Sequence, residues 1–315
     1  MSQHIPFTKI VGTGNDFVLI DAARRQFNGL AGQWPRLART LCSRRRADVD
    51  GLLVLERSRR ADVRMRIFNP DGSEPSMCGN GIRCLAWYAH HSGAAGSRLT
   101  IETNAGIKQA WILAKHCVRI DMGTPRVLQR SVRLRAPVRQ AALIDSGVPH
   151  VVCWVDDLRR IDVNRLGRRL RHDRRFRPSG ANVDFIRAGA WHSVLDRRQG
   201  ALVHRVTLTM RTYERGVEGE TQACGTGAVA AATAAAFARL KEQRPMTSAD
   251  PLPAGRESGL MHCVVEVRVP GGLLRVEVGA KRLRSGRVLF SHAWLEGPVI
   301  LLGRGTVAWN HRGAA

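Results

Sequence analysis

Two short stretches, far apart in the chain, share the same arrangement of cysteine and glycine. Residues 78–81 read Cys-Gly-Asn-Gly and residues 224–227 read Cys-Gly-Thr-Gly, and good helix formers follow each. Each cysteine is therefore predicted at the N-terminus of a helix, where free backbone N–H groups and the helix dipole favour an anion. Thiols at such positions have pKa values lowered from about 8.5 into the range ~3.5–7.5. A thiolate near neutral pH is therefore accessible at such a position.

The glycines beside each cysteine leave room for a ligand carboxylate to reach the same N–H groups. Two such helix ends could hold one carboxylate, while one thiolate removes a proton from the adjacent carbon and the other thiol donates a proton to the opposite face. This chemistry inverts a stereocentre. The alternative is a pair of inert cysteines, since free cysteine is commonly buried. Glu74 and Glu220, each four residues before a cysteine, favour the functional interpretation.

Neither a metal nor an organic cofactor is expected. Cys78 and Cys84 are six residues apart, and no Cys-Xaa-Xaa-Cys or structural zinc framework is recognisable. A pyridoxal enzyme needs a Schiff-base lysine, and no lysine of this chain lies in a motif typical of that role.

The composition is that of a globular chain long enough for two domains. Its 315 residues are 44% hydrophobic, which supplies apolar surface for two cores. No apolar run approaches the ~18 residues of a membrane helix, and residues 1–20 lack the features of a signal peptide. The seven cysteines, an odd number, indicate reduced thiols rather than a disulfide framework. These features predict a cytoplasmic protein with no membrane partner.

A formal net charge of +24 raises the question of nucleic-acid binding. The arginines are scattered apart from local clusters at residues 44–46 and 159–177, and aromatic residues make up only 5% of the chain, too few for base-stacking platforms. No RRM, KH, helix-turn-helix or zinc-finger pattern is recognisable. We expect no specific nucleic-acid partner, and only nonspecific polyanion binding at low salt.

The first half of the chain has the pattern of several strands and two helices. Residues 7–11 and 17–21 are apolar runs joined by a Gly-rich turn, which predicts a hairpin. A short amphipathic helix is expected at residues 34–42, and a second helix follows Cys78. Further strands are predicted at residues 51–55, 62–68, 99–103, 108–113 and 117–122.

The second half repeats this plan. Residues 147–152 parallel residues 14–19, and a helical stretch at residues 163–170 comes next. A second helix follows Cys224, and residues 241–259 have the composition of a flexible insertion. Strands are predicted at residues 182–186, 206–210, 263–278 and 294–302.

The repeat predicts two pseudo-symmetric halves. Residues 1–125 would form an N-terminal half that carries Cys78, and residues 126–302 a C-terminal half that carries Cys224. A C-terminal strand near residues 303–315 would return to the first half. The two cysteine helices are expected to face each other across a cleft.

Several long motifs together resemble those of diaminopimelate epimerase. They are Gly-Asn-Asp-Phe at residues 14–17, Phe-Asn-Pro-Asp-Gly-Ser at 68–73, Met-Cys-Gly-Asn-Gly-Ile-Arg-Cys at 77–84, Glu-Arg-Gly at 214–216 and Gly-Glu-Thr-Gln-Ala-Cys-Gly-Thr-Gly at 219–227. The resemblance implies cofactor-independent interconversion of LL- and meso-2,6-diaminopimelate in lysine and peptidoglycan precursor synthesis. It also implies an α+β fold of two similar β-rich, barrel-like domains, each around a central helix, in a homodimer.

The resemblance also implies roles for single residues. Cys78 and Cys224 would be the acid/base thiols, and His150 and Glu214 would assist at the reacting centre, although His150 could also be a hydrogen-bonded core residue. The groups expected to hold the reacting carboxylate are Gly79, Asn80, Gly225 and Thr226. Those expected to hold the remaining groups of the substrate are Asn15, Asn69, Asn182, Glu214 and Arg215.

Three features depart from the family's pattern. Gly-Val-Pro-His at residues 147–150 replaces Gly-Asn-Pro-His, so Val148 stands where an amide is expected to contact the far end of the substrate. Residues 46–51 lack the first two glycines of a Gly-rich loop, and the insertion at residues 241–259 is atypical. Two rival functions follow: a related two-cysteine racemase for another amino acid, as among proline racemase relatives, and a noncatalytic polyanion-binding paralogue.

Replacing Val148 by Asn tests the choice of substrate. If diaminopimelate is the substrate, Val leaves one of its polar groups without a partner, a loss of roughly 1–3 kcal/mol or about 5- to 150-fold in kcat/KM. We therefore expect Val148→Asn to raise kcat/KM for diaminopimelate, measured beside a panel of monoamino acids. A wild type that is inactive on diaminopimelate but active on another amino acid would contradict the assignment.

Overall fold

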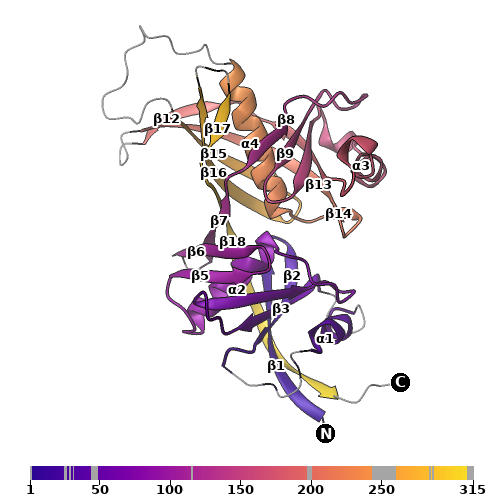
Figure 1. The fold of residues 1–315 in the computed structure, drawn as a ribbon, viewed down its shortest axis with the longest axis vertical. Coiled ribbons are helices and arrows are strands. Elements are labelled where there is room, and N and C mark those ends of the chain that lie inside the picture. Colours follow the sequence, from indigo (N-terminus) through magenta and orange to yellow (C-terminus); the bar gives the residue numbers. More distant parts are fainter. Residues whose placement is uncertain are drawn as a thin grey trace. The chain divides into compact units, whose positions relative to one another are not determined.

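The computed structural model describes residues 2–24, 27, 30, 32–43, 49–114, 116–196, 201–242, 260–283, 285 and 287–310. The chain divides into two compact units (Figure 1): residues 1–120 with 296–315, and residues 121–295. The predicted insertion from residue 243 onward, and residues 44–48 of the predicted loop, lie outside the described residues. Across the described residues, no helix is both long enough and apolar enough to span a membrane.

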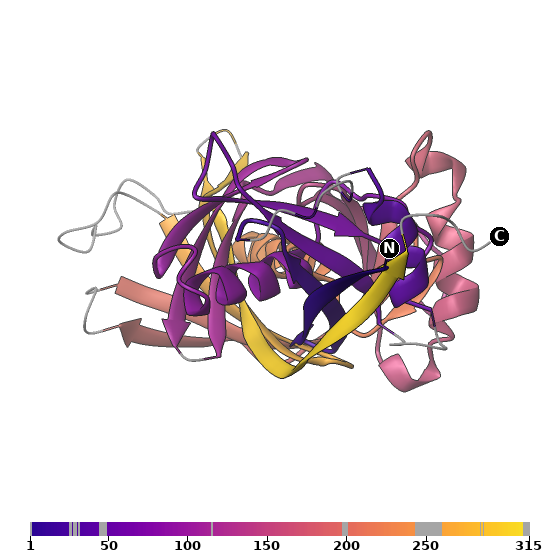
Figure 2. The ribbon, with the colours of Figure 1, turned by 90° about the horizontal axis from the view of Figure 1, so that it is seen from below.

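The strands of the first unit form a closed ring. Neighbours pair in the order β1–β2–β3–β4–β5–β6–β7–β18, and β18 pairs with β1. Figure 2 shows β1 and β18 side by side, antiparallel from Ser2 opposite Asn310 to Gly12 opposite Val299. The strands are β1 Ser2–Gly12, β2 Asn15–Asp21, β3 Gly51–Glu56, β4 Val63–Phe68, β5 Arg98–Thr103, β6 Gly106–Ala114, β7 Cys117–Gly123 and β18 Ala293–Asn310.

Helix α2 (Gly79–His91) is the central element of this ring. It contacts β1, β2, β3, β4 and β6, and nearly every residue from Gly79 to Ala89 is buried. Helix α1 (Trp34–Leu41) packs its apolar stripe outside β2 and β3, with Trp34, Leu37 and Leu41 in one cluster with Leu52 and Val54. Because helices cover both faces of β3, its sequence is apolar without alternation.

The second unit is built in the same way. Helix α4 (Gly225–Glu242) contacts β9, β10, β11, β13, β15 and β16, while α3 (Val163–Arg171) packs against β11 and β13. The run of alanines in α4 allows the strands to approach it closely, and most of the helix is buried. The strands are β8 Arg126–Gln129, β9 Gln140–Asp145, β10 Pro149–Trp154, β11 Asn182–Ala188, β12 His192–Asp196, β13 Ala201–Glu214, β14 Gly219–Thr221, β15 Leu260–Val269, β16 Gly272–Arg282 and β17 Val288–Phe290; two 3₁₀ turns are η1 Leu158–Arg160 and η2 Arg174–Phe176.

The order of strand pairings confirms the predicted repeat. In the first unit β1–β2, β2–β3, β3–β4, β4–β5 and β5–β6 are antiparallel, parallel, antiparallel, parallel and antiparallel. In the second unit β9–β10, β10–β11, β11–β13, β13–β15 and β15–β16 follow the same series. The cysteine helix lies in the second parallel connection of each unit. The fold is therefore α+β, with two similar β-rich units around central helices.

A substitution at Gly167 tests how closely α3 packs against β13 in the second unit. A Cβ at this position would lie 2.4 Å from the Cβ of Tyr213 on β13, so a methyl group forces the helix away from the sheet. Such overpacking costs about 1–3 kcal/mol, which outweighs the helix preference for alanine of about 1 kcal/mol. We expect Gly167→Ala to lower the free energy of urea unfolding, whereas Arg169→Ala, exposed on the same helix, leaves it near wild type. Equal stability of the two variants would contradict this packing.

Candidate active site

Cys78 caps the N-terminus of α2 as the sequence predicts. Its carbonyl oxygen accepts the first intrahelical hydrogen bond, from the N–H of Ile82 at 2.9 Å. Its sulfur accepts from the N–H of Gly81 at 3.4 Å. The thiol is half-buried. The side chain thus lies against the positive end of the helix dipole, where a thiolate is favoured.

The Asn80 side chain joins this helix end to the turn between β1 and β2. Its amide nitrogen donates to Oδ1 of Asn15, and Nδ2 of Asn15 donates to Oδ2 of Asp50 at 3.0 Å. A Cβ at Gly12 would lie 2.8 Å from the carbonyl oxygen of Asn80, so β1 approaches the helix where only glycine fits. The structure therefore brings together three of the residues predicted for the site: Asn15, Cys78 and Asn80.

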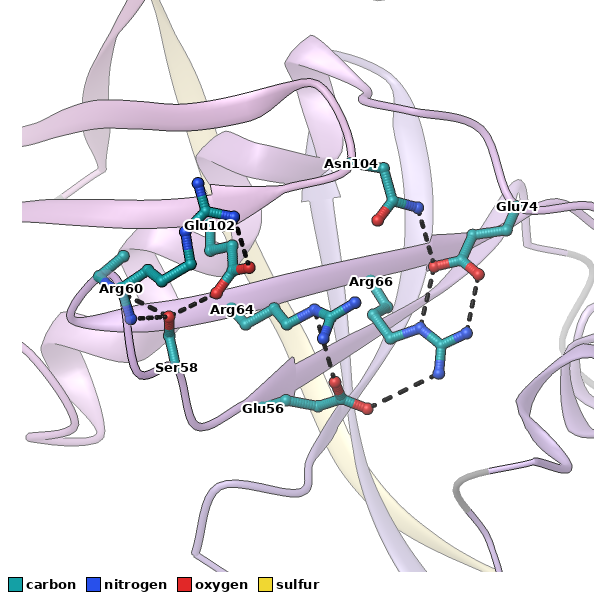
Figure 3. Close-up of polar contacts among 9 residues, drawn as sticks. Glu56, Ser58, Arg60, Arg64, Arg66, Glu74, Glu102 and Asn104 are labelled. Atoms are coloured by element: carbon teal, nitrogen blue, oxygen red, sulfur yellow. Dashed lines mark hydrogen bonds and ion pairs between the residues drawn. The ribbon is translucent and has the colours of Figure 1, made fainter.

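The carboxylates at matched offsets before the cysteines bind arginines of the preceding strands. Arg66 on β4 donates to Glu74 through Nε at 2.9 Å and Nη2 at 2.7 Å, as Figure 3 shows. Arg211 on β13 donates to Glu220 through the same two atoms, each at 2.7 Å. Such bidentate pairs fix geometry as well as charge. Each pair holds the loop that enters a cysteine helix.

Asn69 lies in the turn that follows β4. Its N–H donates to the carbonyl oxygen of Ser73 at 2.9 Å, and its Nδ2 donates to Oγ of Ser73 at 2.9 Å. The structure thus places Asn69 in the loop leading to Cys78, with its amide engaged inside that loop.

Cys224 caps α4 in the same way, but its surroundings are different. Its carbonyl oxygen accepts from the N–H of Ala228 at 2.9 Å, and its sulfur lies 3.4 Å from Oγ1 of Thr226. Burial raises the pKa of the Cys224 thiol well above its ordinary value, and the carboxylates of Glu214 and Asp184 raise it further. Of the two thiols, Cys224 is therefore the one whose surroundings favour the protonated form. The cost of burying a thiolate is larger than the stabilisation that the helix N-terminus offers, so Cys224 remains a thiol.

His150 is fully buried and connects Thr226 to Asp184. Its Nδ1 lies 2.7 Å from Oδ2 of Asp184, which can only accept, so Nδ1 carries the proton. Its Nε2 lies 3.0 Å from Oγ1 of Thr226 and 3.2 Å from Nδ2 of Asn182. Because Oδ1 of Asn182 accepts from the N–H of Arg215 at 2.7 Å, the amide group of Asn182 directs its nitrogen at His150. In this network Nε2 is placed to accept a hydrogen bond.

These contacts give the Cys224 proton a path away from sulfur. The thiol can donate to Oγ1 of Thr226, whose own hydroxyl can donate to Nε2 of His150. Thr212 donates to the second carboxylate oxygen of Asp184 at 2.8 Å, which fixes Asp184 behind the ring. Gly227 permits this arrangement, since a Cβ there would lie 2.6 Å from Asp184. The network can assist proton exchange at a thiol that burial keeps neutral.

The remaining predicted residues of the second unit lie at the rim of this network. Glu214 is the last residue of β13, and it acts on Cys224 through its charge. The Arg215 side chain donates to the carbonyl oxygen of Ser179 at 3.4 Å. Gly225 is the first residue of α4, and Val148 is half-buried in the turn before β10.

Sequence reasoning missed Asp184, Thr212, Asp50 and Arg83. For Asp184 a signal was present, because it lies two residues after Asn182 on a strand and therefore on the same face. Arg83 is likewise one helical turn after Gly79 and Asn80. Among the described residues, no group of His, Cys, Asp and Glu side chains is arranged to hold a metal ion.

Because the pKa of Cys224 is raised in the folded state, we expect the free energy of unfolding to fall at alkaline pH. The unfolded thiol ionises near 8.5, at about its ordinary value, whereas the folded thiol keeps its proton to higher pH. The stabilising contribution is complete below that unfolded value and is lost as pH rises above it, by up to ~1.4 kcal/mol per pH unit. Urea unfolding at about pH 7.5 and 9.5 measures the loss.

Two variants are compared with wild type in this measurement. Cys224→Ala is expected to lose less stability at high pH than wild type. Thr233→Ala, which changes a side chain that does not titrate on the same helix, is expected to lose as much as wild type. An identical pH dependence in wild type and Cys224→Ala would refute the argument.

The sequence matches the family described as diaminopimelate epimerase over residues 7–128 and 142–288. The diaminopimelate epimerase of Methanothrix thermoacetophila is 36% identical over 322 residues, covering 97% of this chain and 97% of the relative. That of Archaeoglobus fulgidus is 38% identical over 293 residues, covering 88% and 90%.

Solved structures of low sequence identity share the fold. A phenazine biosynthesis protein of the PhzF family from Bacillus anthracis has a TM-score of 0.64, with 16% identity, over 97% of this chain and 99% of that chain. A probable proline racemase from Agrobacterium radiobacter has a TM-score of 0.60, with 19% identity, over 97% and 93%. At these identities the likeness concerns the fold alone.

Proposed function

Since this chain belongs to the diaminopimelate epimerase family, we propose that it interconverts LL- and meso-2,6-diaminopimelate without a cofactor, as a step of lysine and peptidoglycan precursor synthesis. One observation of the site carries the proposal: each unit presents a cysteine as the cap of a central helix, with a backbone N–H donating to its sulfur. The repeated device supplies two thiols for one stereocentre.

The reaction needs a base on one face of the α-carbon and an acid on the other. One sulfur, as thiolate, takes the α-proton, and the electron pair left on carbon is stabilised by the neighbouring carboxylate. The second sulfur, as thiol, then gives its proton to the opposite face, so the two sulfurs exchange protonation states. N–H groups of the first helical turns, at Gly79, Asn80, Gly225 and Thr226, are suited to hold the carboxylate as its charge grows.

The two thiols start from different states in this scheme. Cys224 is the proton donor of the resting enzyme, because burial and the carboxylates of Glu214 and Asp184 keep it neutral. Cys78 is then the base. In the reverse direction Cys224 must act as a thiolate, and we assign the Thr226–His150 path to the removal and return of its proton.

The remaining groups of a diamino-dicarboxylate need separate partners. We assign these contacts to Asn15, Asn69, Asn182, Glu214 and Arg215, of which Arg215 can bind a carboxylate with two N–H groups. A second amino-acid head on the substrate accounts for so many amide and charged side chains. In the structure the amides of Asn15, Asn69 and Asn182 have protein partners, which the substrate groups would share or replace.

We also propose a cytoplasmic homodimer. All seven cysteines of the chain are free, as is usual in a reducing compartment. Three consecutive apolar residues on β18 are exposed, namely Ile300, Leu301 and Leu302, and apolar side chains gathered on a surface are typical of a protein contact.

Removing either thiol is expected to abolish epimerisation. A positioned acid or base is worth ~10²–10⁴-fold in rate, and without it one face of the α-carbon lacks a proton carrier. Purified Cys78→Ala and Cys224→Ala are assayed with LL-diaminopimelate in deuterated water, following both the meso product and deuterium at the α-carbon.

Cys263→Ala is the matched control, since it removes another buried thiol on β15 and should retain activity. Near-normal formation of the meso product by either Cys78→Ala or Cys224→Ala would disprove the two-thiol mechanism.

A further inference from the structure

Arg83 is a fully buried arginine in the helix that Cys78 caps. Its Nη1 donates to the carbonyl oxygen of Gly79 at 3.0 Å, and its Nη2 donates to Oδ1 of Asn80 and Oγ1 of Thr13, each at 2.8 Å. The three acceptors belong to the first turn of α2 and to the β1–β2 turn. The guanidinium therefore links the first turn of α2, which begins at Cys78, to the β1–β2 turn.

This buried charge has no carboxylate beside it in the described part of the chain. Its three acceptors are neutral oxygens, and its Nε makes no hydrogen bond among the described residues. A buried charge is ordinarily paired, because leaving water without a counter-charge is strongly unfavourable. A conventional structural ion pair does not explain Arg83.

The groups that can supply negative charge are thiols. The guanidinium interacts with Cys84, Cys78 and Cys117 when these are ionised. Cys84 stays neutral, because its complete burial raises its pKa far above the ordinary value. Cys78 is half-buried and also accepts an N–H from the first turn of the helix, so it is the thiol best placed to carry the compensating charge.

We propose that Arg83 is the positioning residue of Cys78: its buried guanidinium fixes the first turn of α2 and the Asn80 amide, and it supplies the positive charge beside which the Cys78 thiolate forms. The inference rests on the proposed function in taking Cys78 as a reacting thiol. It adds a role for a side chain that does not itself contact the substrate.

The second unit lacks this device. The residue five positions after Cys224 is Val229, which is buried and apolar, where Arg83 stands five positions after Cys78. The charged neighbours of Cys224 are instead the carboxylates of Glu214 and Asp184. The two cysteine helices therefore share a backbone arrangement and have opposite electrostatic surroundings.

Other titratable groups near Arg83 do not replace its effect. Asp16 on β2 is paired with Lys9 at 3.4 Å, and Asp50 accepts from Asn15 and from the N–H of Asp16. Cys117 on β7 is half-buried and also interacts with the guanidinium when ionised, so its alkylation is followed beside that of Cys78 and the control is a different arginine.

Alkylation by iodoacetamide as a function of pH tests the proposal, with modification of Cys78 and Cys117 quantified by peptide mass spectrometry. In wild type the midpoint for Cys78 is expected below the free-thiol value of about 8.5. Arg83→Met removes the charge and is expected to raise that midpoint by about 1–3 pH units. Arg83→Lys retains the charge and is expected to keep the midpoint near wild type, while its altered donors lower kcat.

Arg98→Gln, which removes an exposed arginine on β5, is the control and should leave the Cys78 midpoint unchanged. A wild-type midpoint at or above the free-thiol value would overturn the proposal, and so would a folded Arg83→Met protein with the wild-type midpoint. A Lys variant shifted as far as the Met variant would also overturn it. If Arg83→Met does not fold, wild type and Arg83→Lys decide. The alkylation measurement does not depend on the substrate. Its result would therefore still hold if the enzyme proved inactive on diaminopimelate.

Discussion

The first turn of a helix leaves backbone N–H groups without intrahelical partners, and in both units of this chain that turn begins at a cysteine. Each sulfur accepts one of these groups, from Gly81 or Gly227. The strands around each helix must pass close to the same turn, and glycines make this possible. Gly12 lets β1 approach α2, and Gly227 lets Asp184 approach the start of α4. In each unit the first turn of the helix therefore lies close to the neighbouring strands, while most of the helix that follows is buried.

The repeated backbone arrangement does not produce two equivalent thiols. In the first unit a buried guanidinium donates to the first turn of the cysteine helix, and in the second unit the carboxylates of Glu214 and Asp184 raise the pKa of the cysteine. Two thiols with equal pKa values would have no built-in difference between the proton donor and the base. Unequal surroundings instead favour one thiolate and one thiol, which is the starting condition that inversion of a stereocentre requires.

Most of the fold follows from sequence pattern, because glycine, apolar periodicity and helix formers act locally. The starts of both cysteine helices, the β1–β2 hairpin and the repeat of the two halves are confirmed. The protonation of Cys224 was not predictable in this way. It is set by burial and by Asp184 and Glu214, which come from strands remote in sequence. The same holds for Glu74 and Glu220, whose arginine partners become evident only once the strands are paired.

The pairing of β1 with β18 has a consequence for how the chain matures. The first unit needs residues 296–310 to close its ring, whereas the second unit is contiguous from residue 121 to residue 295. On the ribosome the second unit is therefore fully synthesised before the strand that completes the first unit emerges. The usual order, in which the N-terminal part of a protein folds first, is reversed for ring closure. Until residues 296–310 emerge, β1 retains an open edge, and its pairing with β18 is a long-range step of the kind that slows folding.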